Sequence, residues 1–195
     1  MSMTLWFIIG YISGGLPFSV WLGRIFARAD VRRVGDGNPG AANAWKAGGW
    51  KVGVAALVLD FLKGALPVAA AHFIFNLSGW PLALAASAPV LGHAFSPFLN
   101  FRGGKGLTVT FGVWSGLTLA QAPLVLGLFM ALFYFTLSVE AWAVVFSMVG
   151  LFVHLLIQQA EGALLLAWFG NLAIVVWKHR RELRQTPRLK PLFRV

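Results

Sequence analysis

Cysteine is absent from this chain of 195 residues, and acidic residues are scarce. Without a thiol the protein forms no disulfide, no thiolate metal site and no cysteine nucleophile. Charged residues make up only 11% of the sequence, against about 25% in a typical soluble domain, whereas 58% of the residues are hydrophobic. This composition argues against a water-soluble globular protein.

The charge is also one-sided, because 16 Lys and Arg against 6 Asp and Glu give a net charge of +10. Lipid and anionic molecules are therefore both candidate partners.

Long apolar runs predict an all-α, polytopic integral membrane helix bundle. A spanning helix needs about 20 mostly apolar residues, whereas the strands of a membrane β-barrel would alternate apolar and polar residues. We expect one integral membrane domain, residues 1–195, with about seven spans, or five or six if residues 107–137 form half-length pieces. The predicted spans are residues 4–23, 52–75, 81–99, 107–120, 123–137, 141–157 and 162–177.

The basic residues predict the orientation of the spans, because Lys and Arg beside span ends stay on the cytoplasmic side. Every basic residue except Lys63 falls in loop 24–51, in loop 100–106 or in the tail 178–195, and the connections of opposite parity carry none. These three segments are therefore expected in the cytoplasm. The C-terminus is then cytoplasmic and the N-terminus lies outside.

The second predicted span contains two charges, Asp60 and Lys63, three residues apart. This helical spacing puts both on one face. Each charge costs roughly 2.5–3.5 kcal/mol at mid-membrane, so the span should insert only if the two residues pair or face a polar cavity. We expect a role at the functional site, since ionisable residues in membranes are usually functional. A purely structural ion pair is the alternative.

A glycine-rich loop precedes this span. It contains the pattern G-x-G-x-x-G, but a charged segment precedes it where a dinucleotide-binding fold has a buried strand. The backbone N–H groups of such a turn can face an anion, with amide and basic side chains completing the cradle. A plain flexible loop is the alternative. The predicted phosphate-binding residues are Gly37, Asn38, Gly40, Asn43 and Lys46.

A second glycine-rich loop precedes the fourth predicted span. It is not a Walker A loop, because a glycine follows the lysine where that motif has Ser or Thr. Basic residues around a Gly-Gly pair at a helix start would hold a phosphate against the helix N-terminus, and a positive-inside anchor is the alternative. The predicted phosphate-binding residues, on both sides of Lys105, are Arg102, Gly103, Gly104 and Gly106.

The remaining histidines differ in what they suggest. His179 begins a basic tail that resembles a polybasic anchor for anionic lipid, and it would approach both loops if the bundle brings them together. His72 and His154 are expected to be packed bundle residues. No second histidine lies at metal-binding spacing from either, so no metal site is expected.

Four motifs in this order and spacing resemble the PlsY family of bacterial membrane enzymes, which transfer an acyl chain from acyl phosphate to glycerol 3-phosphate and so form lysophosphatidic acid. The resemblance covers nearly the whole chain. The motifs are Asn38-Pro39-Gly40-Ala41-x-Asn43, Asp60-x-x-Lys63-Gly64, Gly92-His93-x-Phe95 and Gly103-Gly104-Lys105-Gly106.

The resemblance implies a multi-pass acyltransferase of phospholipid biosynthesis in the bacterial plasma (inner) membrane. Its partners would be acyl phosphate, glycerol 3-phosphate and membrane lipid, with no cofactor, no metal and no nucleic acid, and it would be a monomer. The acyl chain would lie in a lipid-accessible groove. Since the phosphate of an acyl phosphate leaves readily, a hydroxyl can attack directly once both substrates are oriented. The residues assigned catalytic roles are Lys105, His179 and Asp36, and those assigned supporting roles are Asp60, Lys63, His93 and Glu182.

The chain departs from the family pattern near the phosphates. PlsY usually has Ser in place of Asp36, Thr in place of Ala42 and Arg in place of Lys46, and its tail motif has Asn where this chain has Glu182. A carboxylate about 4 Å from a phosphate charge costs roughly 4 kcal/mol at an effective dielectric of 20. Either basic neighbours neutralise the two carboxylates, or Asp36 acts as a base toward a neutral or cationic acceptor. A non-enzymatic protein that binds lipid or anions is the third alternative.

Overall fold

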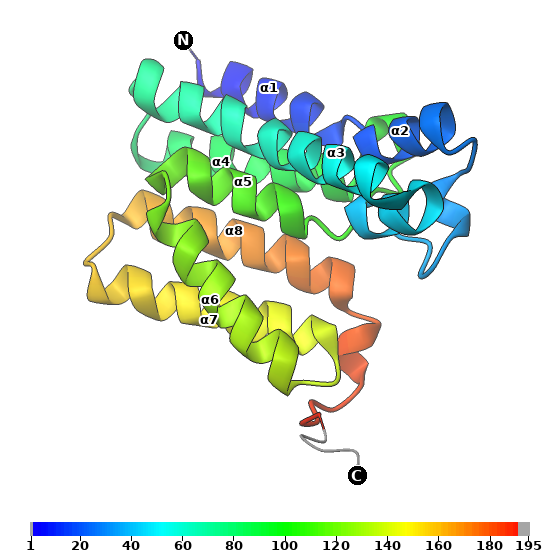
Figure 1. Ribbon diagram of the computed structural model, residues 1–195. Coiled ribbons are helices and arrows are strands. Elements are labelled where there is room, and N and C mark those ends of the chain that lie inside the picture. The colour runs from blue at the N-terminus through cyan, green and yellow to red at the C-terminus, as the bar shows by residue number, and fades with distance from the viewer. Residues whose placement is uncertain (1, 191–195) are drawn as a thin grey trace.

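The computed structural model describes residues 2–190, and within them the chain is helical with no strand (Figure 1). This confirms the predicted all-α fold. The last residues of the predicted tail, 191–195, lie outside the described residues. The α-helices are α1 (Met3–Gly15), α2 (Phe18–Phe26), α3 (Ala41–Ala69), α4 (Gly79–Ala94), α5 (Leu107–Thr118), α6 (Gln121–Thr136), α7 (Glu140–Ile157) and α8 (Gly162–His179). Shorter helical turns are η1 (Val31–Arg33), η2 (Ala70–Ile74), η3 (Pro97–Leu99) and η4 (Glu182–Arg184).

Helices occupy all seven predicted segments, but they differ in length. Five helical segments of the described chain are long and apolar enough to cross a membrane. Helix α6 has 16 residues and α5 only 12, and 12 residues rise about 18 Å against a hydrocarbon core of about 30 Å. The count of seven spans therefore stays a prediction. The five long segments are Met3–Phe26, Ala41–Ile74, Gly79–Leu99, Glu140–Ile157 and Gly162–His179.

Two predicted segments contain details that the sequence pattern did not indicate. The first span, 4–23, breaks between α1 and α2, because Pro17 lacks a backbone N–H and disfavours helical geometry at Leu16. Within the predicted loop 24–51, α3 already begins at Ala41 and bends at Gly49, where φ is +75°. Glycine adopts this angle without steric cost, so the helix changes direction there and continues into the membrane segment.

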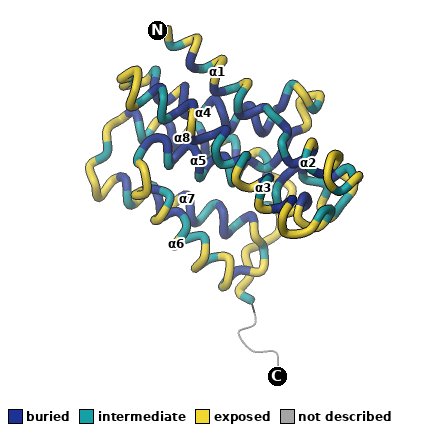
Figure 2. The backbone as a smooth tube through the Cα atoms, turned by 45° about the horizontal axis from the view of Figure 1, so that its top comes forward, coloured by how far each residue is buried: buried dark blue, intermediate teal, exposed yellow. Residues whose placement is uncertain are grey.

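The helices pack closely because small residues lie at their crossings. A Cβ added to Gly112 of α5 would overlap the carbonyl oxygen of Phe61 in α3, and one added to Gly64 would lie 2.5 Å from the carbonyl oxygen of Val109. Buried residues concentrate where α4, α5 and α8 lie together (Figure 2). Outward-facing apolar side chains such as Leu128 and Phe135 are 72% exposed, as expected of a surface that meets lipid.

Four segments that are far apart in the sequence meet at one end of the bundle. The starts of α3 and α5, the connection between α6 and α7 and the end of α8 all lie toward the right of Figure 1. They line one common cavity. The helix packing therefore brings together loops that are far apart in the sequence.

Candidate active site

A cavity of about 830 Å³ lies at this end of the bundle. It joins both glycine-rich loops to the end of α8. The predicted site residues that line it are Asp36, Asn38, Gly40, Asn43, Lys46, Asp60, His93, Lys105, Gly106, His179 and Glu182.

Five predicted residues do not line this cavity. Lys63 and Gly104 line a smaller space beside it, and Gly103 packs against the end of α4. Gly37 forms part of the first loop, with φ at +75°. Arg102 is exposed at the surface. Lys63 and Gly104 therefore lie next to the cavity, because Asp60 and His93 line both spaces.

Lys105 lies between two carboxylates. Its Nζ is 2.8 Å from Oδ2 of Asp36 and 2.9 Å from Oε1 of Glu182. Partial burial lowers the pKa of Lys105, but the hydrogen bonds to both carboxylates outweigh it and raise the pKa above its ordinary value. Lys105 is therefore charged at neutral pH, and its single positive charge is shared between the two carboxylates that set this chain apart from the family pattern.

Asp36 also organises the first loop. Its Oδ1 accepts hydrogen bonds from the backbone N–H of Asn38 at 3.1 Å and from Nδ2 of Asn43 at 2.8 Å. Partial burial raises the pKa of Asp36, but the hydrogen bonds from Lys105, Asn38 and Asn43 outweigh it and lower the pKa to about 2. A Cβ on Gly35, where φ is +58°, would overlap the side-chain oxygen of Asn43, so the loop needs glycine there.

Two helix N-termini open into the cavity. The first turn of α3, from Gly40 to Asn43, and the first turn of α5, from Gly106 to Thr108, both line it. The first N–H groups of a helix have no partner within the helix, and the helix dipole is positive there. Together with Lys46 and Lys105, these groups make a site suited to anions.

The Asp60–Lys63 pair forms inside the bundle as predicted. Lys63 Nζ lies 2.6 Å from Oδ1 of Asp60, and both side chains are 2% exposed. Ser19 Oγ donates to Oδ2 of Asp60 at 2.8 Å, and Lys63 Nζ donates to the carbonyl oxygen of Leu16 at 2.7 Å. The pair thus holds the break between α1 and α2 against α3. Asp60 also lines the cavity, so the structural role and the site-facing role coincide.

Two buried histidines lie beside the cavity. The ring of His93 occupies the space that a Cβ on Gly104 would need, so the Gly-Gly loop can pass close to α4. His179 Nδ1 lies 2.8 Å from the carbonyl oxygen of Val175. Since a carbonyl only accepts, Nδ1 carries the proton, and Nε2 is the nitrogen available to a ligand.

Sequence reasoning missed the contribution of the α6–α7 connection. Tyr134, Ser138 and Glu140 line the cavity, although the sequence pattern placed Tyr134 in the span 123–137 and Ser138 and Glu140 only in the connection to the next span. The sequence did contain an indication of this role. Ser138 and Glu140 interrupt an apolar stretch, and this interruption is predicted on the same side of the membrane as the two glycine-rich loops. The described residues contain no group of three or more His, Cys, Asp or Glu placed to hold a metal ion.

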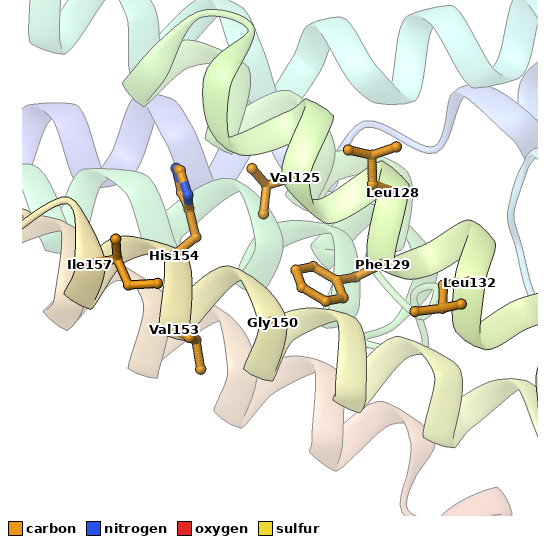
Figure 3. Close-up of a pocket in the computed structure, with 8 residues that line it drawn as sticks. All are labelled: Val125, Leu128, Phe129, Leu132, Gly150, Val153, His154 and Ile157. Atoms are coloured by element: carbon orange, nitrogen blue, oxygen red, sulfur yellow. The ribbon is translucent and has the colours of Figure 1, made fainter.

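An apolar groove of about 360 Å³ runs between α6 and α7 beyond this connection (Figure 3). Side chains of both helices line it, and His154 is the one titratable side chain among them. His154 was expected to be a packed bundle residue, and the structure places it on the wall of this groove. The lining residues are Val125, Leu128, Phe129, Leu132, Gly150, Val153, His154 and Ile157.

Known proteins resemble this chain over nearly its full length. The family model described as glycerol-3-phosphate acyltransferase matches residues 4–188. Glycerol-3-phosphate acyltransferase 1 of Thermotoga maritima is 38% identical over 193 residues, covering 91% of this chain and 94% of the relative. The glycerol-3-phosphate acyltransferase of Listeria monocytogenes is 31% identical, covering 94% and 92%.

Two crystal structures share the fold. Both are of PlsY (YgiH), an integral membrane glycerol 3-phosphate acyltransferase, and each covers 94% of this chain and 91% of its own. The glycerol 3-phosphate form superposes with a TM-score of 0.82 at 29% identity, and the lysophosphatidic acid form with 0.83 at 27%. The helices described above are therefore those of an integral membrane protein.

Proposed function

The chain belongs to the glycerol-3-phosphate acyltransferase family, and on that premise we propose that it transfers a fatty acyl chain from acyl phosphate to glycerol 3-phosphate. The product is lysophosphatidic acid for phospholipid synthesis. The observation that carries the proposal is the position of Lys105. It lies in a cavity into which two helix N-termini open, beside both glycine-rich loops. Two phosphorylated substrates need this concentration of positive groups.

The reaction needs positioning more than a covalent nucleophile. A hydroxyl oxygen of glycerol 3-phosphate attacks the acyl carbon, the bond from that carbon to the phosphate oxygen breaks, and the departing phosphate takes the hydroxyl proton. Lys105 and Lys46 compensate the phosphate charges, and Nε2 of His179, which carries no proton when Nδ1 does, accepts a hydrogen bond from a hydroxyl of glycerol 3-phosphate. With a pKa of about 2, Asp36 is a poor base, so its role is to hold Lys105 and the first loop.

The distribution of basic residues supports a proposal for how the protein lies in the membrane. The protein is a monomer of one multi-pass domain in the bacterial plasma membrane. The segment between α2 and α3, loop 100–106 and the tail face the cytoplasm, where water-soluble glycerol 3-phosphate is available. The acyl chain lies in the groove between α6 and α7, which follows the same two helices that contribute Tyr134 and Glu140 to the cavity.

The activity is tested with purified protein, palmitoyl phosphate and labelled glycerol 3-phosphate. We expect labelled lysophosphatidic acid from the parent protein and almost none from Lys105→Met, which keeps the length of the side chain and removes its charge. Palmitoyl coenzyme A serves as the control donor. Absence of product from the parent, while an active PlsY works in parallel, would contradict the proposal.

The groove assignment has its own test. Leu132→Trp puts bulk into the groove near the cavity, whereas Leu66→Trp makes the same change on α3, where the side chain is 62% exposed. We expect Leu132→Trp to slow transfer from palmitoyl phosphate several-fold more than transfer from octanoyl phosphate. Equal effects on both donors, or the same chain-length effect from Leu66→Trp, would argue against this groove.

A different acceptor is the second candidate, and the contacts of Asp36 and Glu182 with Lys105 favour it. If both carboxylates stay in place, a neutral hydroxyl compound fits the site better than a phosphate. Glycerol in place of glycerol 3-phosphate would then give labelled monoacylglycerol, and Asp36→Ser would create glycerol 3-phosphate activity where the parent has almost none. Lipid binding without product from either acceptor would indicate the non-enzymatic alternative.

A further inference from the structure

Lys178 connects three segments at the end of α8. Its Nζ donates hydrogen bonds to the carbonyl oxygen of Ala94 at 2.9 Å and to that of Gly103 at 2.8 Å. The same ammonium lies 5.4 Å from the centre of the Phe95 ring. Lys178 is partly buried and does not line the cavity. The sequence pattern suggested a lipid anchor here, but the side chain points into the protein.

The two acceptors belong to a joint between α4 and the second glycine-rich loop. Ala94 is the last residue of α4, and the final carbonyls of a helix lack partners within it and attract a cation. The backbone N–H of Gly104 donates to the carbonyl oxygen of His93 at 3.0 Å. A Cβ on Gly103 would overlap that same oxygen. The loop therefore lies directly on the end of the helix.

The joint leads straight to Lys105, two residues after Gly103. Two consecutive glycines give the backbone more conformational freedom than any other pair, so the loop needs contacts outside itself to hold one conformation. The hydrogen bond of Gly104 supplies one contact to α4. Lys178 supplies a second contact by donating to the carbonyl oxygen of Gly103. This contact connects the loop to α8, whereas the hydrogen bond of Gly104 connects it to α4.

We propose that Lys178 is a positioning residue, which clamps the Gly103–Gly104 segment onto the end of α4 and so fixes Lys105 in the cavity. It acts through the loop and touches no substrate. The catalytic consequence rests on the proposed function, because it assumes that Lys105 compensates a phosphate. The next residue, His179, faces the cavity, so the last turn of α8 contributes one side chain to the substrates and one to the loop.

Hydrogen exchange tests the clamp without any assay of activity. Lys178→Met removes both hydrogen bonds and keeps the aliphatic length. Arg180→Met is the matched control, since Arg180 Nη1 also donates to a backbone carbonyl, that of Trp177 at 2.7 Å, and its guanidinium also lies on an aromatic ring at 4.8 Å. We expect faster exchange over residues 100–106 in Lys178→Met only. Unchanged exchange, or equal acceleration in Arg180→Met, would overturn the clamp.

Kinetics test the consequence for Lys105. A displacement of about 1 Å at a catalytic group costs up to roughly a hundredfold in rate, so kcat of Lys178→Met should fall on the order of tenfold or more at unchanged thermal stability. Lys178→Arg keeps a cation with several donors and should recover most of the rate and of the exchange protection. A normal kcat in Lys178→Met, or no recovery in Lys178→Arg, contradicts the positioning role.

Different results would contradict the acyltransferase function and the clamp by Lys178. An inactive parent protein contradicts the proposed function, whereas the exchange comparison of Lys178→Met with Arg180→Met still decides the clamp. An active parent whose Lys178→Met variant keeps full kcat contradicts only the positioning role. Where Lys178→Met fails to fold, Lys178→Gln takes its place in both measurements, because it removes the charge and its two N–H donors sit on a side chain that is one bond shorter.

Discussion

Lys105 contacts two carboxylates in the structure, and in the proposed reaction it would also contact phosphate. In the structure its ammonium contacts Asp36 and Glu182, and a bound phosphate would compete with both carboxylates for the same charge. The Asp36 side chain is 52% exposed, so water screens much of this interaction. The carboxylates therefore weaken phosphate binding moderately and leave the site usable, provided that Lys46 and the two helix N-termini supply further positive potential.

Asp36→Ser should bind glycerol 3-phosphate more tightly than the parent protein. The change removes one competing carboxylate and keeps an oxygen that can accept from Asn38 and Asn43. An exposed ion pair is worth at most about 1 kcal/mol, which corresponds to a decrease in KM of up to about fivefold. Initial rates over a range of glycerol 3-phosphate concentrations measure it.

The matched control for this substitution is Asp30→Ser, which breaks the surface pairs of Asp30 with Arg24 and Arg32 outside the cavity. Its KM should equal that of the parent. A higher KM in Asp36→Ser would show that the order which Asp36 gives the first loop outweighs its repulsion of phosphate.

The lowered pKa of Asp36 also predicts how acid affects stability. Its pKa is about 2 in the folded protein against 3.8 ordinarily, so the charged carboxylate stabilises the fold above about pH 4, and this stability is lost as the pH falls toward 2. Asp36→Asn should therefore lose less thermal stability than the parent between pH 5 and pH 3. The expected difference is small, about 1–2 °C, because the side chain is half exposed. Parallel melting curves in detergent that fall equally would contradict it.

At the scale of the elements, the crossing of α3 and α5 fixes the position of the second glycine-rich loop. Gly112 lies against the backbone of Phe61, so Gly112→Ala forces the two helices apart. Overpacking of this kind costs about 1–3 kcal/mol. We expect a lower melting temperature and, since α5 begins two residues after Lys105, a lower rate as well.

Gly127→Ala is the control for this crossing. A Cβ there would meet only a carbon of Phe111, at 3.8 Å, which is ordinary contact. Because alanine favours a helix over glycine by about 0.5–1 kcal/mol, this variant should be as stable as the parent or slightly more so. Equal destabilisation by both substitutions would show that the loss reflects glycine replacement in general rather than this crossing.

The positions of the helices were predictable from apolar runs, but some of their ends were not. Residues between Ala41 and Lys51 are too polar to count as a span, yet they form the start of α3, because alanine and lysine favour helix. The lining of the cavity was predictable where the chain carries charge and glycine together, as around Asp36 and Lys105. The clamp by Lys178 was not, since it joins residues 75 and 84 positions apart and depends on how α8 packs on α4.

At the scale of the whole molecule, the basic residues and the cavity occupy the same end of the bundle. The loops that line the cavity, before α3 and before α5, carry the excess of Lys and Arg, as does the tail after α8. Basic segments stay in the cytoplasm. We therefore predict that one arrangement of charge both orients the protein in the membrane and directs the cavity toward the cytoplasm, where glycerol 3-phosphate is available.

The absence of cysteine makes this orientation directly testable, because any single introduced cysteine is the sole site for a maleimide. Ser2 precedes α1, Gln158 follows α7 and Thr186 lies in the tail after α8, and all three are exposed. In intact spheroplasts a membrane-impermeant maleimide should label Ser2→Cys and Gln158→Cys, and it should label Thr186→Cys only after permeabilisation. Retained acyltransferase activity is the control for folding. Labelling of Ser2→Cys and Thr186→Cys from the same side would exclude an odd number of spans, and the reverse pattern would place the cavity outside the cell, away from its substrate.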